Sequence, residues 1–523
     1  MPKFKYILKS FLYFKKQHLA VLAGTIITTA VITGALIVGD SVKLSLTNIV
    51  KNRLGNVQYV LQSNDRFVRA KLAEEISNKL NVKSAPVILL QGITSNPEND
   101  VRINKTQVVG VDSSFWLFSN KKMPNLNTDE AIISENVAEK LNLKVNDELV
   151  LRVEKLSVIP INSPFSAEEI PSVSFRLKIK AIADENNLGR FSLKNNQVAP
   201  YNVFISREYL SAKLDVNGLV NVVLLSEQKN IIPDSDFFNN ILSDVWSVKD
   251  AGIEINKIDN RNYEITSDRI FIDKQISLSI LKKIPNAKSI LTYLVNSISL
   301  NENSTPYSFV TAVSENYSGK ELKENEILIN DWLSEDLNSK VGDTLNLKYF
   351  VIDDRQNLRE DSNLFIVKGI IPTKDSLINR SLMPKFPGFA TAISCVEWNT
   401  NIPIDLKKIR DKDEKYWNEY RGTPKAVISI EAGKKLWENK FGDYTSIRFN
   451  DSVFNSSINN PSQEILKEIN PEDLNLSIVE VKTSGLQSAS TGVDFGQLFL
   501  SLNYCCYLQR LVWRYDLVGE PFV

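Results

Sequence analysis

The residues from 19 to 38, LAVLAGTIITTAVITGALIV, form a run of twenty positions without a charge. At 1.5 Å per residue a helix of this length reaches about 30 Å, which is the thickness of the hydrocarbon core of a bilayer. The run therefore predicts a membrane-spanning helix, which we place at 19–39. The remainder of the chain is far more polar and must fold outside the membrane.

The charges on either side of this run predict its orientation. Lysines precede it at positions 3, 5, 9, 15 and 16 without any acidic residue, whereas Asp40 follows it directly. The positive-inside rule then keeps the N-terminus in the cytoplasm and exports the body of the chain. A cleaved signal peptide is the alternative, but its apolar region would span only about 7–15 residues. The sequence favours an uncleaved anchor in contact with the lipid bilayer.

The segments that flank the anchor also have helical patterns. Residues 1–18 combine lysines with apolar residues at helical spacing, which is typical of a basic amphipathic segment lying along the cytoplasmic interface. Residues 40–56 continue an apolar stripe up to Gly55, which predicts a stalk helix that ends there. Small residues four apart allow a second membrane helix to approach closely. These candidate helix-packing positions are Ala20, Gly24, Ala30, Gly34, Ala35 and Gly39. Because glycine and alanine are common in membrane helices in general, a role in packing and no special role remain equally open.

Composition excludes several classes of function. The 62 basic and 62 acidic side chains leave no net charge, so nothing points to nucleic acid as a partner. The single histidine, His18, and three cysteines, Cys395, Cys505 and Cys506, are too few for the usual zinc or histidine-rich metal sites. The sequence contains no GxxxxGK[ST], GxSxG or HExxH motif. We therefore assign no catalytic, cofactor-binding or metal-binding residue and expect a protein that is not an enzyme.

The exported body contains an internal duplication. DEAIISENVAEKLNLKVNDELVLRV at 129–153 parallels NEILINDWLSEDLNSKVGDTLNLKYF at 325–350, with the same spacing between the shared residues. Two further pairs of segments are similar: 108–116 parallels 309–317, and 176–183 parallels 364–371. Each copy alternates strand and helix patterns. The fold class expected is therefore α+β: an N-terminal transmembrane helix with a large exterior domain of two tandem α+β repeats.

The repeats set the expected domain boundaries. Beyond the stalk these are repeat 1 at 57–227, a connector at 228–262, repeat 2 at 263–450 with an insertion at 383–422, a return segment to the membrane at 451–494, and an incomplete second transmembrane helix with an aberrant tail at 495–523.

The insertion in repeat 2 is rich in aromatic and charged residues. Trp398, Tyr416, Trp417 and Tyr420 stand beside several ionic residues, which predicts either a packed, ion-paired lobe or a candidate partner surface. The packed lobe is favoured. Within the insertion, DKDE at 411–414 is the densest carboxylate cluster, and the flanking lysines indicate a solvated, ion-paired helix face rather than an acid and base pair.

Several strings of this chain, among them GALIVGDSVKLSL, LTYLVNSI, MPKFPGF and YRGTPKAV, resemble the FtsX-like, MacB-type permeases of ABC transporters. The resemblance runs from about residue 3 to residue 502. It implies a MacB-like periplasmic core domain, a bacterial inner-membrane location with the main domain in the periplasm, and further membrane helices. It also implies a cytoplasmic ABC ATPase subunit that binds the ATP, a second permease copy or homologue, and the transport or extraction of an envelope substrate.

The end of the chain departs from this family pattern. After Leu502 come Asn503, Gln509, Arg510 and Arg514, where about twenty apolar residues are needed to cross the membrane. We expect a truncation or frame shift near residue 502, the alternative being a genuine amphipathic C-terminal helix. With the present end the chain would instead be a single-pass, membrane-anchored periplasmic binding or adaptor protein.

Overall fold

The structure is a computed structural model of the chain. The residues that it describes are 3–63, 66–99, 101–154, 164, 172–195, 198–228, 235–319, 321–352, 358–386, 388–398, 402–450, 452 and 461–491. The predicted second membrane segment at 495–523, with its polar tail, lies outside the described residues.

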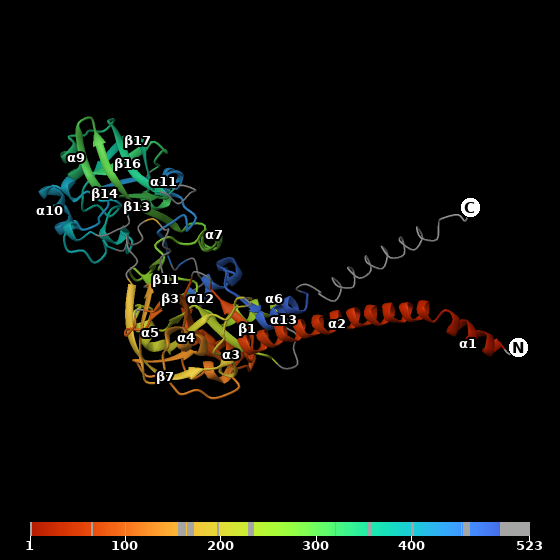
Figure 1. Cartoon of the computed structure of the whole chain (residues 1–523). Helices are drawn as coiled ribbons and strands as arrows, with labels where there is room; N and C mark the ends of the chain where they lie inside the picture. Colours follow the sequence, from red (N-terminus) through yellow and green to blue (C-terminus); the bar gives the residue numbers. More distant parts are fainter. Residues whose placement is uncertain are drawn as a thin grey trace.

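A long helix connects the N-terminus to the exterior domain (Figure 1). After a short helix α1 (Lys3–Tyr13), α2 runs from Lys15 to Leu54 over 40 residues without a break. It ends at Gly55, whose φ of 53° lies in the region that glycine enters freely. Within the part of the chain that the structure describes, α2 is the one helix long and apolar enough to cross a membrane. Since the membrane core takes only about 30 Å of a helix about 60 Å long, the span and the stalk are one rigid rod.

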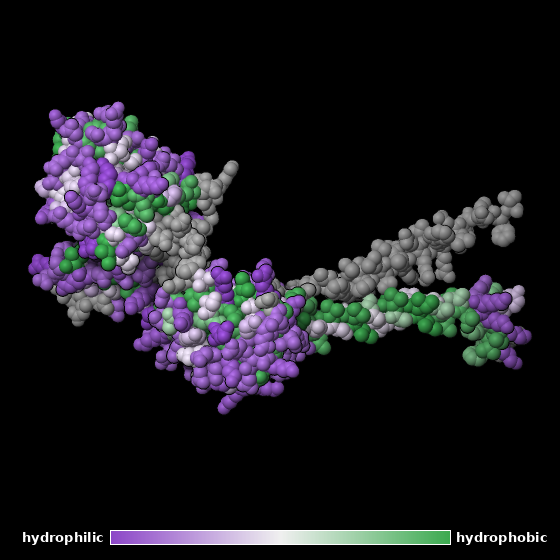
Figure 2. Space-filling model, turned by 60° about the vertical axis from the view of Figure 1, so that its left-hand side comes forward, coloured by the Kyte–Doolittle hydropathy of each residue, from purple (hydrophilic) through white to green (hydrophobic). Residues whose placement is uncertain are grey.

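The apolar surface of the molecule is concentrated on this rod. Figure 2 shows hydrophobic residues along most of α2, whereas the face of the two lobes turned to the viewer is mostly hydrophilic. This contrast is what a membrane segment attached to a water-exposed domain requires.

The exterior domain has two lobes. Lobe 1 follows α2 and consists of β1 (Val57–Gln62), β2 (Val68–Arg69), α3 (Ala70–Leu80), β3 (Ser84–Ser95), β4 (Arg102–Val111), η1 (Phe115–Phe118), β5 (Glu130–Ser134), α4 (Glu135–Leu141), β6 (Glu148–Glu154), β7 (Ser172–Ala183), η2 (Glu185–Asn187), β8 (Tyr201–Ser206), α5 (Arg207–Lys213), β9 (Leu219–Val220) and β10 (Val222–Ser226). Its large sheet has the strand order β20-β1-β10-β3-β4-β8-β5-β7-β6, with a further pairing of β3 with β6; β20 (Ser477–Glu480) comes from the return segment.

Lobe 2 is reached through α6 (Ser235–Val245). It consists of β11 (Ile253–Lys257), β12 (Asn262–Ser267), α7 (Lys274–Lys283), β13 (Lys288–Leu300), β14 (Asn303–Val313), α8 (Glu315–Ser318), β15 (Glu326–Asn330), α9 (Asp331–Leu337), β16 (Thr344–Ile352), β17 (Leu358–Ile371), η3 (Arg380–Leu382), η4 (Cys395–Glu397), η5 (Leu406–Lys408), α10 (Asp411–Tyr420), β18 (Ala426–Ser429), α11 (Ile430–Trp437) and β19 (Ser446–Asn450). The chain then returns to lobe 1 through α12 (Pro461–Leu466), η7 (Pro471–Leu474), β20 (Ser477–Glu480) and α13 (Val481–Thr491).

The two sheets have the same topology, which confirms the predicted duplication and the α+β class. The order in lobe 2 is β11-β12-β19-β13-β14-β18-β15-β17-β16, and β13 also pairs with β16 as β3 does with β6. These extra pairings close six strands of each lobe into a barrel, which leaves few free sheet edges. The register shift in one parallel strand pair is also repeated: it lies at Ala131/Ile132 where β5 pairs with β7, and at Ile327/Leu328 where β15 pairs with β17.

The residues shared by the two repeats have local structural roles. The Leu-Asn pair that ends α4 and α9 places Asn142 and Asn338 in the left-handed region, with φ of 52° and 53°, where asparagine caps a helix well. In the following turn the backbone N–H of Lys144 donates to Asp147, and that of Lys340 donates to Asp343, at 2.7 Å in both repeats. These aspartates hold turns, and the turns set the register of the strands that follow.

The lobes differ in the strand that pairs with β1 or β12. In lobe 2 this strand is β11, which directly precedes β12, whereas in lobe 1 it is β20, from the far end of the described chain. The return segment therefore completes the first sheet. This exchange brings the two ends of the exterior domain together beside α2.

Candidate functional site

The place where α2 enters lobe 1 is the first candidate site, because membrane and exterior domain meet there. Helix α13 packs along the outer end of α2, and β20 lies beside β1. Val50, Leu54 and Ala489 are buried in this contact, with Leu46 and Leu486 packed against them. We call this contact the stalk junction. Motion of α2 can reach lobe 1 through it and through the direct connection to β1.

Polar contacts fix the end of α2 within the junction. The Arg53 side chain is 4% exposed, donates to the backbone carbonyl of Lys194, and donates from Nη2 to Asn195 Oδ1 at 2.8 Å. Burial lowers the pKa of this guanidinium from its ordinary value. A Cβ at Gly485 would lie 3.0 Å from Val50 Cγ1 and 3.3 Å from Arg53 Nη2, so the missing side chain allows α13 to approach closely. Lys482 Nζ donates to the carbonyl of Gly55 at 3.0 Å. The junction is closely packed and hydrogen-bonded.

The predicted small-residue positions fall on two sides of α2. Gly24, Ala35 and Gly39 lie within an arc of about 60° that also contains Leu46 and Arg53 of the junction, and Ala20 lies about 40° outside it. The other two positions, Ala30 and Gly34, lie on a different side. No described atom lies within 4 Å of a Cβ built at Gly24 or Gly34. Helix packing at all six positions remains a prediction.

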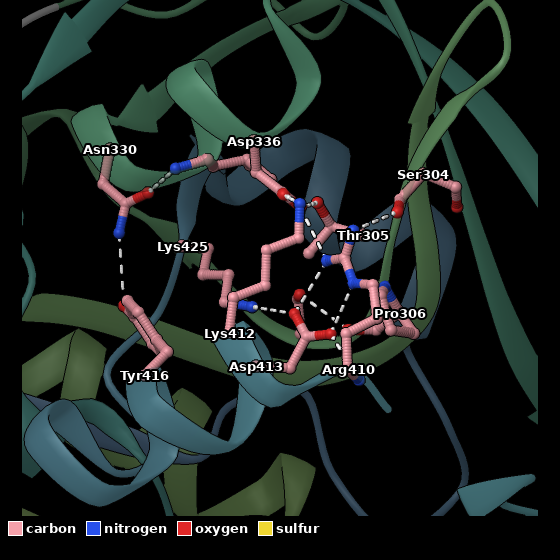
Figure 3. Close-up of polar contacts among 12 residues, drawn as sticks. Ser304, Thr305, Pro306, Asn330, Asp336, Arg410, Lys412, Asp413, Tyr416 and Lys425 are labelled. Carbon is pink, nitrogen blue, oxygen red and sulfur yellow. Dashed lines mark hydrogen bonds and ion pairs between the residues drawn. The ribbon is translucent and has the colours of Figure 1, made fainter. Parts of the chain in front are cut away.

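The second candidate site is an ion-paired cluster between the insertion and the barrel of lobe 2 (Figure 3). Arg410 at the start of α10 donates from Nε to Asp413 at 2.7 Å and from Nη2 to Asp336 of α9 at 2.6 Å. Lys412 also pairs with Asp336, and Thr305 of β14 donates to that carboxylate at 2.5 Å. Charges on the insertion and on the barrel thus neutralise each other across the contact.

Lys425 lies beneath this cluster and is its least expected member. Its side chain is buried, with Nζ 3.9 Å from Asp413 Oδ1 and above the rings of Trp332 and Tyr416, 4.1 and 4.7 Å from their centroids. Burial lowers the pKa of Lys425 to about 7, and Asp413 partly opposes this shift. The same position in repeat 1 is Asn202, as the strand pairings show. The lysine is thus specific to the lobe that carries the insertion.

The lowered pKa of Lys425 predicts a pH dependence of stability. Between about pH 7 and 10.5 the unfolded chain binds a proton that the folded chain does not, so the free energy of unfolding rises with pH, by up to ~1.4 kcal/mol per pH unit. Below about pH 7 both states carry the proton and the full destabilisation remains. Thermal unfolding of the detergent-solubilised chain, followed by tryptophan fluorescence, should show the melting temperature rising from pH 7 to pH 9. In Lys425→Met this rise should disappear.

Lys412→Met is the matched control for that measurement, because Lys412 is solvent-exposed and pairs with Asp336 of the same cluster. It should keep the rise of the wild-type chain. Equal pH profiles in the wild-type chain and in Lys425→Met would show that Lys425 is protonated in the folded state throughout this range.

The aromatic residues of the insertion pack inward. Tyr416 and Trp417 are each 4% exposed, Trp417 contacts Trp398 edge to face at 4.9 Å, and Tyr416 lies 5.0 Å from Tyr420. Trp398 and Tyr420 keep partial exposure. Tyr416 and Trp417 therefore cannot contribute to a partner surface, because the lobe itself covers their rings. The favoured packed-lobe interpretation describes them.

The interpretation of DKDE at 411–414 as a solvated helix face is wrong for one of its carboxylates. Asp411 and Lys412 are exposed, but Asp413 is 7% exposed and pairs with Arg410 and Lys425. Helical spacing turns Asp413 toward Lys425. Lys425 lies outside the DKDE string, and nothing in the local sequence connects it with Asp413. Asp413 is held by the guanidinium of Arg410 on one side and by the amine of Lys425 on the other, which suits a structural role.

Sequence reasoning did not find Arg53, Gly485 or Lys425. A glycine inside a helix, such as Gly485, is a usable signal of close approach. For Arg53 and Lys425 the neighbouring sequence gives no comparable signal, because their partners are distant along the chain.

The comparisons with known proteins agree with this architecture. A family model described as the MacB-like periplasmic core domain matches residues 19–195. The chain therefore contains a MacB-like periplasmic core domain, and its predicted resemblance to the N-terminal portion of FtsX-like, MacB-type permeases is confirmed. The match covers α2 and most of lobe 1. No curated protein matches the chain.

Solved structures similar to this chain include the following three. The periplasmic region of MacB from Actinobacillus actinomycetemcomitans is 8% identical, with 37% of this chain and 86% of that one covered and a TM-score of 0.25. The extracellular domain of the noncanonic ABC-type transporter YknZ from Gram-positive bacteria is 10% identical, with 36% and 88% covered and a TM-score of 0.23. A domain of a putative permease from Porphyromonas gingivalis is 10% identical, with 38% and 84% covered and a TM-score of 0.25. At TM-scores this low we draw nothing further from these three likenesses.

Proposed function

We propose that this chain, which carries the N-terminal portion of an FtsX-like, MacB-type permease, is the membrane subunit of an ABC transporter that passes motion from a separate cytoplasmic ATPase to its exterior lobes. The ATPase binds and hydrolyses the ATP, so this subunit needs no cofactor of its own. The work done outside the membrane is the transport or extraction of an envelope substrate. The location that fits is the bacterial inner membrane, with the N-terminus in the cytoplasm and the lobes in the periplasm.

The single observation that carries the proposal is the unbroken α2 joined to lobe 1 at the stalk junction. A helix that merely anchors a domain can be followed by a flexible linker. Here 40 helical residues lead directly into β1, and the buried Arg53 fixes the end of the helix. A rigid rod held at one end in a folded lobe transmits tilt and rotation, which is what a mechanical subunit requires.

The partner side of the proposal rests on the family resemblance. The proposed partners are a cytoplasmic ABC ATPase and a second permease copy or homologue, and the full-length protein is proposed to have further membrane helices. Sequencing of the coding DNA through codon 502 tests the expected truncation or frame shift. A frame that restores about twenty apolar residues supports it, and a verified stop after Val523 with no alternative frame argues against it.

Co-purification tests the assignment itself. The full-length protein, extracted in mild detergent from its own membrane, should bring down an ATPase with a GxxxxGK[ST] loop in a fixed ratio. An assembled complex without any ATPase would refute the permease assignment. Topology mapping distinguishes the permease from the alternative of a single-pass binding or adaptor protein. Single cysteines placed beyond residue 502 are labelled from either side of the membrane, and only the permease should have a cytoplasmic segment there.

A further inference from the structure

A polar cavity of about 210 Å³ lies on lobe 2, between the sheet formed by β11, β12 and β19 and the segment 381–385. An apolar cavity of about 150 Å³ holds a benzene molecule, so this space accommodates a side chain or a small organic molecule. The cavity is distinct from the stalk junction and from the ion-paired cluster under α10. Neither of the proposed roles above uses it.

The duplication allows the wall of this cavity to be compared with the equivalent positions of lobe 1. Glu264 pairs with Arg448 across β12 and β19 at the positions where Val60 pairs with Leu224 across β1 and β10. In lobe 1 both residues are fully buried in an apolar cluster with Phe115. At equivalent backbone positions, repeat 2 thus has charged groups where repeat 1 has apolar core. Because buried charges cost stability, a polar wall in place of a core wall indicates a requirement other than packing.

The charges of the lining do not balance. Glu264 is occupied by Arg448 Nε at 2.8 Å and by Ser446 Oγ at 2.7 Å, and Glu254 pairs with Lys385 at 3.1 Å. The third carboxylate, Asp268, has no ion-pair partner among the described residues. Partial burial, and next the charge of Glu254, raise the pKa of Asp268, and the charges of Lys385 and Lys249 oppose this shift. Asp268 is exposed to solvent at the cavity. The cavity therefore offers a negative group that a cation from outside can reach.

One part of the lining is apolar, beside serine, threonine and asparagine side chains. Ile270, Leu382 and Met383 contribute hydrocarbon to the wall. A ligand that suits both parts has a positive group with hydrogen-bond donors at one end and an aliphatic stem behind it. A bare metal ion would leave the apolar part unused, and an anion would face the unpaired carboxylate.

We propose that this cavity binds a primary ammonium group on an aliphatic stem, with Asp268 as its counter-charge. A lysine side chain of a polypeptide and a free alkylamine both present this chemistry. The ammonium group lies against Asp268 and Glu254, and the stem lies along Leu382 and Met383. The site goes beyond the proposed transport role, because it gives lobe 2 a ligand specificity that lobe 1 lacks.

Calorimetric titration of the detergent-solubilised full chain tests the proposal. The probes are acetyl-Gly-Lys-Gly-amide, the same peptide with norleucine in place of lysine, and n-butylamine. The lysine peptide should bind saturably and the norleucine peptide at least tenfold more weakly. Comparable binding of butylamine identifies a free amine as a sufficient ligand, whereas binding of the lysine peptide alone identifies a polypeptide source. Failure of both amines to bind overturns the proposal, as does equal binding of the lysine and norleucine peptides.

Two variants locate the site. Asp268→Asn should lower the affinity for the lysine peptide at least tenfold, and Thr266→Phe should block the cavity while every carboxylate remains. Asp411→Asn, at an exposed carboxylate elsewhere on lobe 2, is the matched control and should bind as the wild-type chain does. Full affinity in both Asp268→Asn and Thr266→Phe overturns the assignment to this cavity. Since no ATPase takes part, the outcome is independent of the proposed transport function.

Discussion

A proline in place of Leu44 should uncouple the exterior lobes from ATP hydrolysis. Leu44 lies on α2 beyond the predicted membrane span and before the junction, and its side chain is 62% exposed, so its loss removes little packing. Proline removes a helix hydrogen bond and clashes with the preceding turn, at a cost of about 3 kcal/mol or more. The rod then kinks between membrane and lobe 1. Motion of the membrane part would be absorbed at the kink.

The measurement is a distance between the lobes in the complex with the ATPase. Spin labels on cysteines replacing Leu117 of lobe 1 and Leu278 of lobe 2, both exposed, with Cys505 and Cys506 changed to serine, should report a distance change on addition of ATP. In Leu44→Pro the change should vanish while ATP hydrolysis continues. Leu44→Ala, which keeps the helix, should behave as the wild-type chain does. An unchanged response in Leu44→Pro contradicts the rigid-rod mechanism.

Much of this fold follows from sequence because its signals are local or repeated. An uncharged run of twenty residues fixes a membrane helix, and the glycine at position 55 fixes its end. The duplicated Leu-Asn and Asp turn positions predict the α+β repeat because each acts within a few residues. Strand order was beyond reach, since barrel closure through β3 and β6 joins segments about 60 residues apart. Two copies with one pattern nevertheless imply one topology, whatever that topology is.

The candidate sites were less predictable than the fold. The aromatic residues of the insertion were recognised as a group, but their burial depends on Trp332 and Phe389, which lie outside the local pattern. The local sequence predicts that Asp413 is a surface carboxylate, and only the fold shows that Lys425 lies beside it. The same holds for the stalk junction, where β20 and α13 come from more than 400 residues beyond α2. Contacts between distant segments leave no spacing signal in either segment.

The replacement of Ile478 by aspartate should detach the return segment from lobe 1. Ile478 lies in β20 opposite Leu61 of β1, and its side chain is 7% exposed within the main core. An unpaired carboxylate at such a position costs about 3 kcal/mol or more. If β20 opens, β1 becomes a free edge, and its amides should exchange with solvent ~100-fold faster at this cost. Hydrogen exchange followed by mass spectrometry on peptides that contain residues 57–62 measures this directly.

Val479→Asp provides the matched control, because it introduces the same charge one residue further along β20 where the side chain is 41% exposed. It should leave exchange in β1 close to that of the wild-type chain, and neither variant should change exchange in β12, which β11 protects instead. Equal acceleration by both variants would mean that charge alone disturbs β20. No acceleration in Ile478→Asp would mean that β20 does not hold β1 in place. The expected difference between the two lobes follows from a topological asymmetry: lobe 2 takes its edge strand from the segment next to it, whereas lobe 1 takes its edge strand from the return segment.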